Sequence, residues 1–264
     1  MTKGTQPLDD VFLSPLVYNG FPCEWSGSKG AFVDLVVLGT NSGVTVAKDE
    51  SNCFGADKPT ASEWGECLFS TTSNGYWLSG YVSTQSKGVN ATAMKAITST
   101  IAGFTSAAAS AMPLEAPAQE TGVWPVISCK KLGAAGKVSS ALRKTLTAQD
   151  EDNSPGALPA GYYASIGAAG LNACDWSAKV GNFTTFEFPG AGVLSSVIEN
   201  ARGVTTVPLP GGAPGYIVPV DGQSNPDIWF FDQPNLVIIA GYSGFTQNDM
   251  TNAALALATE FTTS

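Results

Sequence analysis

The chain contains no histidine, and only 13% of its residues are charged, which is well below the usual share. Without histidine, Ser-His and Cys-His nucleophile pairs and every histidine-bearing metal site are excluded. No run of about 20 apolar residues is present, so no membrane span is predicted. The net charge is −9 and the few cations are scattered. This pattern argues against nucleic acid as a partner, because phosphate contacts need clustered Lys and Arg. We predict no metal and no other cofactor.

Five cysteines are present, but no two of them form a Cys-x-x-Cys pair. This spacing disfavours a thioredoxin-like redox motif and a zinc ribbon, and it favours disulfides in an oxidising compartment. We therefore predict an extracytoplasmic protein, secreted or attached to the cell envelope. Met1–Gly4 leads directly into the polar Gln6–Asp10 with no apolar core, so we expect an export signal to lie upstream.

A short motif occurs twice. Cys23–Ser26 (Cys-Glu-Trp-Ser) precedes the apolar Phe32–Val37, and Cys174–Ser177 (Cys-Asp-Trp-Ser) precedes Phe183–Phe188. The two copies are 151 residues apart at both segments. Self-similarity at a domain-sized offset predicts two tandem domains that arose by duplication. Further along, four residues match at an offset of 161: Phe69, Asn74, Gly80 and Tyr81 correspond to Phe230, Asn235, Gly241 and Tyr242.

The predicted fold class is α+β, with two tandem duplicated domains, each an antiparallel sheet with helices packed on it. Strand-like runs and hairpin signals such as Asn74-Gly75 give way to helical periodicity in both halves. The first repeat is predicted to cover 1–111, the linker 112–123 and the second repeat 124–264. Helices are predicted over 90–111, 129–146, 193–202 and 246–261, and the first carries an apolar stripe of Met94, Ile97, Ile101 and Phe104.

The second repeat has a cysteine that the first repeat lacks. Cys129 opens a predicted helix 45 residues before Cys174, and the equivalent position in the first repeat would precede residue 1. The first repeat therefore lacks its opening helix, either because the chain starts late or because this repeat has degenerated. Cys53 and Cys67 have no counterparts in the second repeat. We predict the disulfides Cys53–Cys67 and Cys129–Cys174, with Cys23 as a free thiol.

Three aromatic side chains are candidate ligand contacts. Trp229 and Phe231 share one face of a predicted strand, and Phe230 lies on the other. Either one face is an exposed aromatic patch, or both faces are covered, one of them by the closing helix. Trp25, like Trp176, either stacks on a ligand or packs over the neighbouring cystine. Because the opening helix is missing, we expect an exposed apolar groove near Trp25. That groove would bind a helix in trans and form a homodimer, or would destabilise the first domain.

Several segments of the second repeat carry a family resemblance. They are Trp124-Pro125, Cys129–Leu132 (Cys-Lys-Lys-Leu) and Cys174–Ser177. With them, the chain resembles exported lipoproteins of actinobacteria that are built from a Cys-stapled domain of unknown function. It is also similar in outline to the extracellular sensor domain of an actinobacterial Ser/Thr kinase. The resemblance implies export, frequent lipid anchoring and no assigned catalysis.

The leading functional prediction is a non-enzymatic, sensor-like or binding protein of the cell envelope, whose ligand or protein partner the sequence does not name. The rival is a glycan-acting hydrolase that uses carboxylates, for which Asp34, Glu63 and Glu66 are the candidates. A solvated loop is the alternative interpretation of Glu63 and Glu66. A third possibility is a purely structural surface protein.

Overall fold

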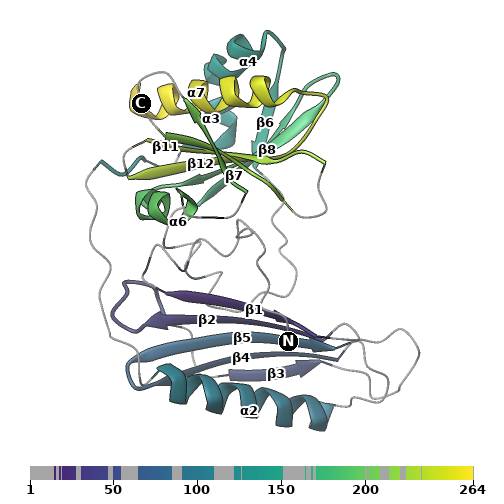
Figure 1. Ribbon diagram of the computed structural model, residues 1–264, viewed down its shortest axis with the longest axis vertical. Coiled ribbons are helices and arrows are strands. Elements are labelled where there is room, and N and C mark those ends of the chain that lie inside the picture. Colours follow the sequence, from purple (N-terminus) through teal and green to yellow (C-terminus); the bar gives the residue numbers. More distant parts are fainter. Residues whose placement is uncertain are drawn as a thin grey trace. The chain divides into compact units, whose positions relative to one another are not determined.

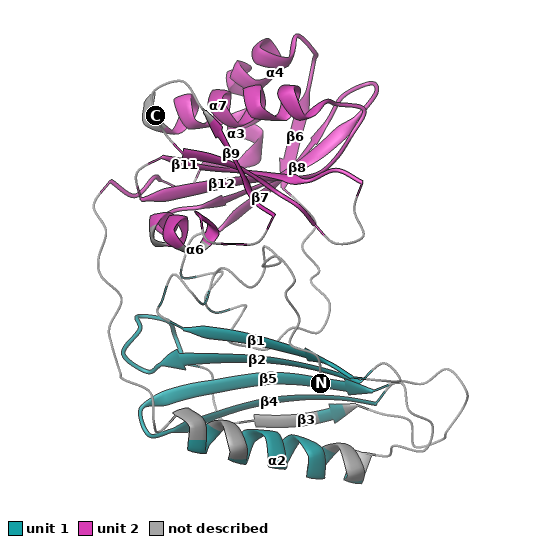
Figure 2. Ribbon diagram, in the orientation of Figure 1, with its two compact units in different colours: residues 1–5, 11–118, 154–168 teal, residues 6–10, 119–153, 169–264 magenta. Residues whose placement is uncertain are grey.

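The computed structural model describes residues 15, 18, 20–27, 31–46, 50–54, 65–84, 91–109, 122–125, 127–150, 164, 168, 171–199, 201, 203–208, 214–220, 224–232 and 234–263. The chain forms two compact units (Figure 2). Unit 1 comprises 1–5, 11–118 and 154–168, and unit 2 comprises 6–10, 119–153 and 169–264. The predicted α+β class is confirmed, since each unit contains an antiparallel sheet, with one described helix packed on it in unit 1 and several in unit 2 (Figure 1). The segment 154–168, which we placed in the second repeat, belongs to unit 1.

Unit 1 is a sheet of five strands in the order β1-β2-β5-β4-β3, with every neighbouring pair antiparallel. The strands are β1 (Phe21–Ser26), β2 (Phe32–Gly39), β3 (Glu50–Phe54), β4 (Gly65–Ser73) and β5 (Tyr76–Thr84). Asn74 and Gly75 both have positive φ and form the tight turn between β4 and β5. Helix α2 (Ala91–Ala109) packs mainly on β3, β4 and β5.

Strand β2 is apolar at nearly every position because both faces of the sheet are covered around it. Leu35 and Val37 belong to the core on the α2 side. Val36 and Leu38 pack with Trp77 on the opposite face, and Ala164 contacts this second cluster. A strand buried on both faces loses the polar alternation of a half-exposed one.

Unit 2 has seven strands in the order β6-β7-β8-β12-β11-β10-β9, again antiparallel throughout. They are β6 (Thr147–Asp150), β7 (Asn172–Ser177), β8 (Asn182–Phe188), β9 (Thr205–Pro208), β10 (Pro214–Val218), β11 (Asp227–Asp232) and β12 (Asn235–Ser243). Helices α3 (Cys129–Ala135), α4 (Lys137–Leu142) and α7 (Gln247–Thr263) lie on one face, and the helical turn η3 (Ala191–Leu194) with α6 (Ser195–Glu199) lies on the other (Figure 1).

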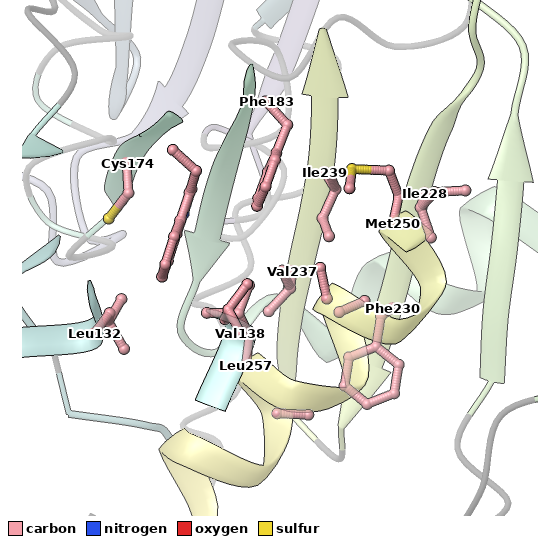
Figure 3. Packing of buried hydrophobic residues seen from close by; sticks show 14 of the residues in the cluster. Leu132, Val138, Cys174, Phe183, Ile228, Phe230, Val237, Ile239, Met250 and Leu257 are labelled. Atoms are coloured by element: carbon pink, nitrogen blue, oxygen red, sulfur yellow. The ribbon is translucent and has the colours of Figure 1, made fainter. Parts of the chain in front are cut away.

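The main core of unit 2 lies between α7 and the central strands. Met250 and Leu257 of α7 are completely buried and point at the inner side chains of β11 and β12 (Figure 3). Trp124 stacks on Phe261 near the end of α7, with ring centroids 4.4 Å apart. Asn235 fixes the backbone at Trp124, since its side-chain oxygen accepts from the Trp124 N–H at 3.0 Å.

The two sheets share one strand order. The central five strands of unit 2, β7-β8-β12-β11-β10, repeat the order of unit 1, and β6 and β9 extend them at the two ends. This agreement is what the tandem-repeat interpretation requires, and a common origin by duplication remains a prediction.

The offsets that we predicted are wrong in detail. Trp25 pairs with Val33 whereas Trp176 pairs with Phe183, so Phe183 takes the place of Val33 and not of Phe32. A slip of one residue reverses the face of a strand. Phe32 lies on the face away from α2, where it meets Tyr81.

The hairpins show a similar correction. In unit 1 the turn follows Ser73 and ends at Tyr76, and in unit 2 it follows Asp232 and ends at Asn235. Asn235 is therefore equivalent to Tyr76, not to Asn74, and the predicted match is displaced by two residues. The alternation of faces survives because a shift of two keeps each side chain on its side.

Three helices also differ from the predictions. The helix predicted over 129–146 is split at Gly136, whose φ of 71° ends α3, and the chain enters β6 at Thr147. The helix predicted over 193–202 ends at Glu199. In α2, Ile97 is 42% exposed and Thr98 is buried, so the predicted stripe is wrong at Ile97. The many small residues of α2 give its sequence little amphipathic contrast. No helix in the described part of the chain is both long and apolar enough to cross a membrane.

Candidate functional site

The candidate binding surface lies at the β1 edge of unit 1. Phe21, Cys23 and Trp25 alternate along β1 on the α2 side, beside Val33 of β2. We call these four residues the β1 surface. Phe21 is 52% exposed, and the other three are only partly buried. Among the described strands, none pairs with the outer edge of β1, which ends the sheet.

In unit 2, the surface that corresponds to the β1 surface is covered by other elements of the same unit. Strand β7 corresponds to β1, but β6 pairs with its outer edge and α3 packs against it. Trp176, the counterpart of Trp25, is 1% exposed and stacks on Phe183 at 5.7 Å. Trp176 is therefore a core residue, and the ligand-stacking alternative is wrong for it. Among the described elements, β1 has no outer strand that corresponds to β6, and Cys23 has no disulfide that corresponds to Cys129–Cys174.

The cysteines follow the predicted scheme. Cys129 and Cys174 form a disulfide that ties α3 to β7, and Cys53 and Cys67 join the neighbouring strands β3 and β4. Cys23 is a free thiol. Its partial burial in apolar surroundings raises the pKa of the thiol, so the reactive thiolate is scarce at neutral pH.

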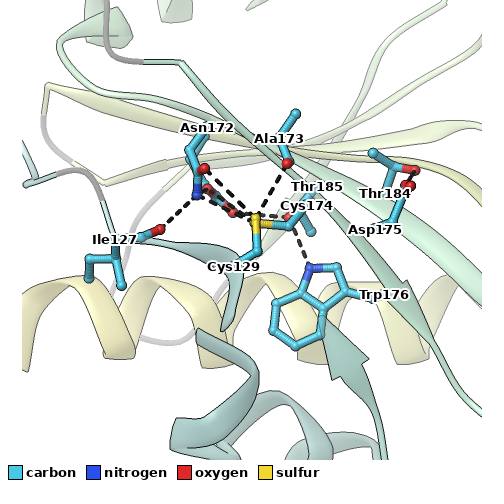
Figure 4. The surroundings of a disulfide bond; sticks show 10 residues. Ile127, Cys129, Asn172, Ala173, Cys174, Asp175, Trp176, Thr184 and Thr185 are labelled. Carbon is cyan, nitrogen blue, oxygen red and sulfur yellow. Dashed lines mark hydrogen bonds between the residues drawn. A yellow bond between two sulfur atoms is a disulfide. The ribbon is translucent and has the colours of Figure 1, made fainter. Parts of the chain in front are cut away.

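A buried polar network adjoins the Cys129–Cys174 disulfide (Figure 4). The indole N–H of Trp176 donates to the Thr185 hydroxyl at 3.0 Å, and that hydroxyl donates to Glu187 Oε1 at 3.0 Å. The amide of Asn172 donates to Glu187 Oε2 at 2.5 Å and to the Ile127 carbonyl at 2.8 Å. The network connects β7 and β8 with the chain that leads into α3.

Glu187 is the functional-looking residue that sequence reasoning missed. It is 1% exposed, and burial raises its pKa to about 8, although hydrogen bonds from Thr185 and Asn172 act in the opposite direction. Glu187 takes the place that Val37 has in unit 1. Trp176 and Thr185 are buried and Asn172 is half-buried, and the hydrogen bonds of Glu187 all go to these protein groups, so we assign it a structural role. An acid between two phenylalanines of a strand was the available signal.

The predicted carboxylates are partly brought together. Asp34 on β2 is 3% exposed and pairs with Tyr81 of β5, on the face of the sheet away from α2. The pKa of Tyr81 is raised to about 12, first by burial and then by the Glu66 and Asp34 carboxylates. Glu63 lies outside the described residues. Within the described ranges, no group of three Asp, Glu, Cys or His residues is arranged to hold a metal ion.

Trp229 and Phe231 do not form an exposed patch. They are 1% and 2% exposed, on the face of β11 away from α7. Phe231 meets the Tyr216 ring edge-on at 5.8 Å, and the Tyr216 hydroxyl donates to Glu199 of α6 at 2.8 Å. Both faces of β11 are therefore covered, and the prediction of an aromatic ligand platform here is wrong. Trp25 is the one predicted aromatic contact that keeps accessible surface.

Comparisons with known proteins do not assign the chain to a family. No family model matches the chain, and no curated protein matches it. One solved structure with weak similarity is that of DynU16, described as a putative protein in the dynemicin biosynthetic locus. The match covers 92% of this chain and 82% of that one at 11% identity, with a TM-score of 0.16. A TM-score of this size supports no statement about fold or function.

Proposed function

We propose that this chain is a non-enzymatic binding protein of the cell envelope, located outside the cytoplasm, and that it binds through the β1 surface. The observation that carries the proposal is the contrast between the two units. Trp176 is covered by α3, β6 and a disulfide, whereas Trp25 keeps accessible surface on an edge strand next to a free thiol. Two disulfides in a chain of this size support an oxidising compartment.

The occupant that we propose for the β1 surface is the same strand of a second copy. An unpaired edge strand is a template for antiparallel pairing, and a two-fold axis makes such pairing self-complementary. With Cys23 opposite Cys23 of the second copy, Phe21 of each copy faces Trp25 of the other. Glu24 then faces Pro22, so this register puts no like charges opposite each other.

Sedimentation velocity over a range of protein concentrations tests this proposal. The wild type is expected to form a dimer, and Phe21→Lys is expected to be monomeric because it places a charge in the joined edge. Val123→Lys, at an exposed apolar position of unit 2, is the matched control and is expected to remain dimeric. A wild type that stays monomeric overturns the second copy as occupant, and an equally dimeric Phe21→Lys overturns the β1 surface.

One observation favours the rival function. Asp34 and Glu66 both act on the Tyr81 hydroxyl, so two carboxylates and a phenol share one face of unit 1. If this group is catalytic, glycan cleavage will be measurable and will be lost in Asp34→Asn and Glu66→Gln. We expect no turnover on a panel of glycan, ester and peptide substrates. Activity that both substitutions abolish would replace our proposal with the hydrolase.

A further inference from the structure

A surface pocket of about 330 Å³ lies in unit 2, apart from the β1 surface and the Glu187 network. Its lining residues come from two connections, the segment between α4 and β6 and the turn between β7 and β8. They are Lys144, Thr145, Ala178, Lys179 and Val180. The volume is at the lower end of the range of small-molecule sites, so it suits a compact ligand.

The charges that line this pocket are both positive, in a chain whose net charge is −9. Lys144 is held in place, since its ammonium lies 3.9 Å from the centre of the Phe245 ring and donates to the Gly244 carbonyl at 3.2 Å. An ammonium has three N–H donors, so that bond leaves two. Lys179 forms no ion pair within the described part of the chain.

One carboxylate near the pocket, that of Asp249, interacts with the charge of Lys144. The charge of Lys144 contributes to the lowered pKa of Asp249, although the Thr246 backbone N–H is the larger cause. The Asp249 carboxylate is engaged at the start of α7, where it accepts from the Thr246 N–H at 2.9 Å and from the Thr246 hydroxyl at 2.8 Å. Asp249 does not line the pocket, and the described residues that do line it include two lysines and a threonine but no Asp or Glu.

The pocket also has an apolar side. Val180 is 71% exposed, and with Ala178 it borders the two lysines. A large aliphatic side chain held in solvent next to cationic groups matches a ligand that has an apolar part as well as a charge. Burying this side chain under a ligand removes apolar surface from water, which favours binding.

The conformation of the turn that carries Val180 depends on two glycines, Gly181 and Gly244. The Ala178 N–H donates to the Gly181 carbonyl at 3.0 Å, which closes the β7–β8 turn. Gly181 has a φ of 102°, and a Cβ there would lie 2.6 Å from the Ser243 carbonyl oxygen. Gly244 has a φ of 67°, and its Cβ would lie 2.8 Å from the Gly181 Cα. The two turns therefore meet backbone to backbone, and such preorganisation reduces the entropic cost of binding.

We infer that this pocket binds a small organic anion in which one carboxylate is joined to a short apolar chain. The carboxylate accepts charge-assisted hydrogen bonds from Lys144 and Lys179 and one from the Thr145 hydroxyl. The apolar chain lies over Val180 and Ala178. A carboxylate has about four acceptor sites on its two oxygens, which is enough for one hydrogen bond from each lysine and one from the threonine.

Titration of the isotope-labelled full chain with hexanoate, followed by amide chemical shifts, tests the inference. Saturable shifts are expected at residues 178–181 and 144–145. Lys179→Gln is expected to weaken hexanoate about tenfold, the loss of one charge-assisted contact. Lys131→Gln, the same charge change at an exposed position of α3, is the control and is expected to have no effect on affinity.

Two further probes separate charge from apolar contact. Hexanamide keeps the chain without the charge, and inorganic phosphate keeps negative charge without the chain, so both are expected to bind at least tenfold more weakly than hexanoate. Val180→Ser is expected to weaken hexanoate and leave phosphate unchanged, and its exposed position leaves the fold intact. Equal affinity for hexanamide, equal affinity for phosphate, or no saturable shift with hexanoate each overturns the inference.

Discussion

Replacing Glu187 with Gln is expected to make the stability of unit 2 less dependent on pH. The folded carboxyl has a pKa of about 8 and the ordinary value is 4.5, so the folded chain keeps a proton that the unfolded chain releases. The contribution of Glu187 to the free energy of unfolding is therefore full below about pH 4.5, falls as pH rises, and levels off above about pH 8. The difference of these pKa values corresponds to roughly 5 kcal/mol as an upper limit.

The substitution suits this test because Gln preserves the network. A Gln amide accepts from Asn172 through its oxygen, as Glu187 does. Its nitrogen donates to the Thr185 hydroxyl, which reverses the bond that this hydroxyl donates to Glu187, so both contacts are kept and near pH 5 the variant is expected to lie within about 1 kcal/mol of the wild type. Urea unfolding followed by NMR signals of unit 2 measures both proteins from about pH 5 to about pH 8. Glu187→Gln is expected to gain stability relative to the wild type across this range. Asp150→Asn, at an exposed position of β6, is the control. A constant difference between Glu187→Gln and the wild type at all pH values would refute the reasoning.

Three more predictions concern the stability of single units. Replacing Cys129 and Cys174 with Ala opens a loop closed over 45 residues and is expected to destabilise unit 2 by about 3–4 kcal/mol in urea; an unchanged midpoint would contradict this. Gly80→Ala places a Cβ 2.2 Å from the Phe69 ring, so thermal unfolding of unit 1 is expected to show a loss of about 1–3 kcal/mol; no loss would mean that the ring moves freely. Asp249 has a lowered pKa, so its stabilising effect is present at neutral pH and is lost as pH falls through the folded value. Asp249→Asn is expected to lower stability at neutral pH and much less in acid, and an equal loss at both would contradict the capping role.

The parts of the fold that the sequence predicted depend on local signals. Asn74 and Gly75 favour a tight turn with positive φ, and they form one. The Cys-x-Trp motif precedes the predicted strands β2 and β8 in the two halves and itself lies in a strand, and counting cysteines identified the two bonded pairs. These features are set within a few residues or by elimination, so one sequence was enough to find them.

The parts that the sequence did not predict depend on what lies across the sheet. Phe32 and Phe183 look equivalent along the chain, but strand pairing puts them on opposite faces. Trp229 is buried on the face of β11 away from α7, and the strand pattern alone does not show that this second face is covered. Next to Val180, two turns far apart in sequence meet backbone to backbone at Gly181 and Gly244. None of these contacts has a local signature.

Cross-linking of Cys23 tests the proposed binding mode most directly. Alkylation without prior reduction is expected to label this thiol alone among the five cysteines, slowly because its pKa is raised. If the β1 strands of two copies pair with Cys23 opposite Cys23, a short bismaleimide at mildly alkaline pH will join two chains through these thiols. The account predicts a covalent dimer in the wild type and its loss in Phe21→Lys, which keeps the thiol. Complete labelling of Cys23 without any cross-linked dimer would contradict the account.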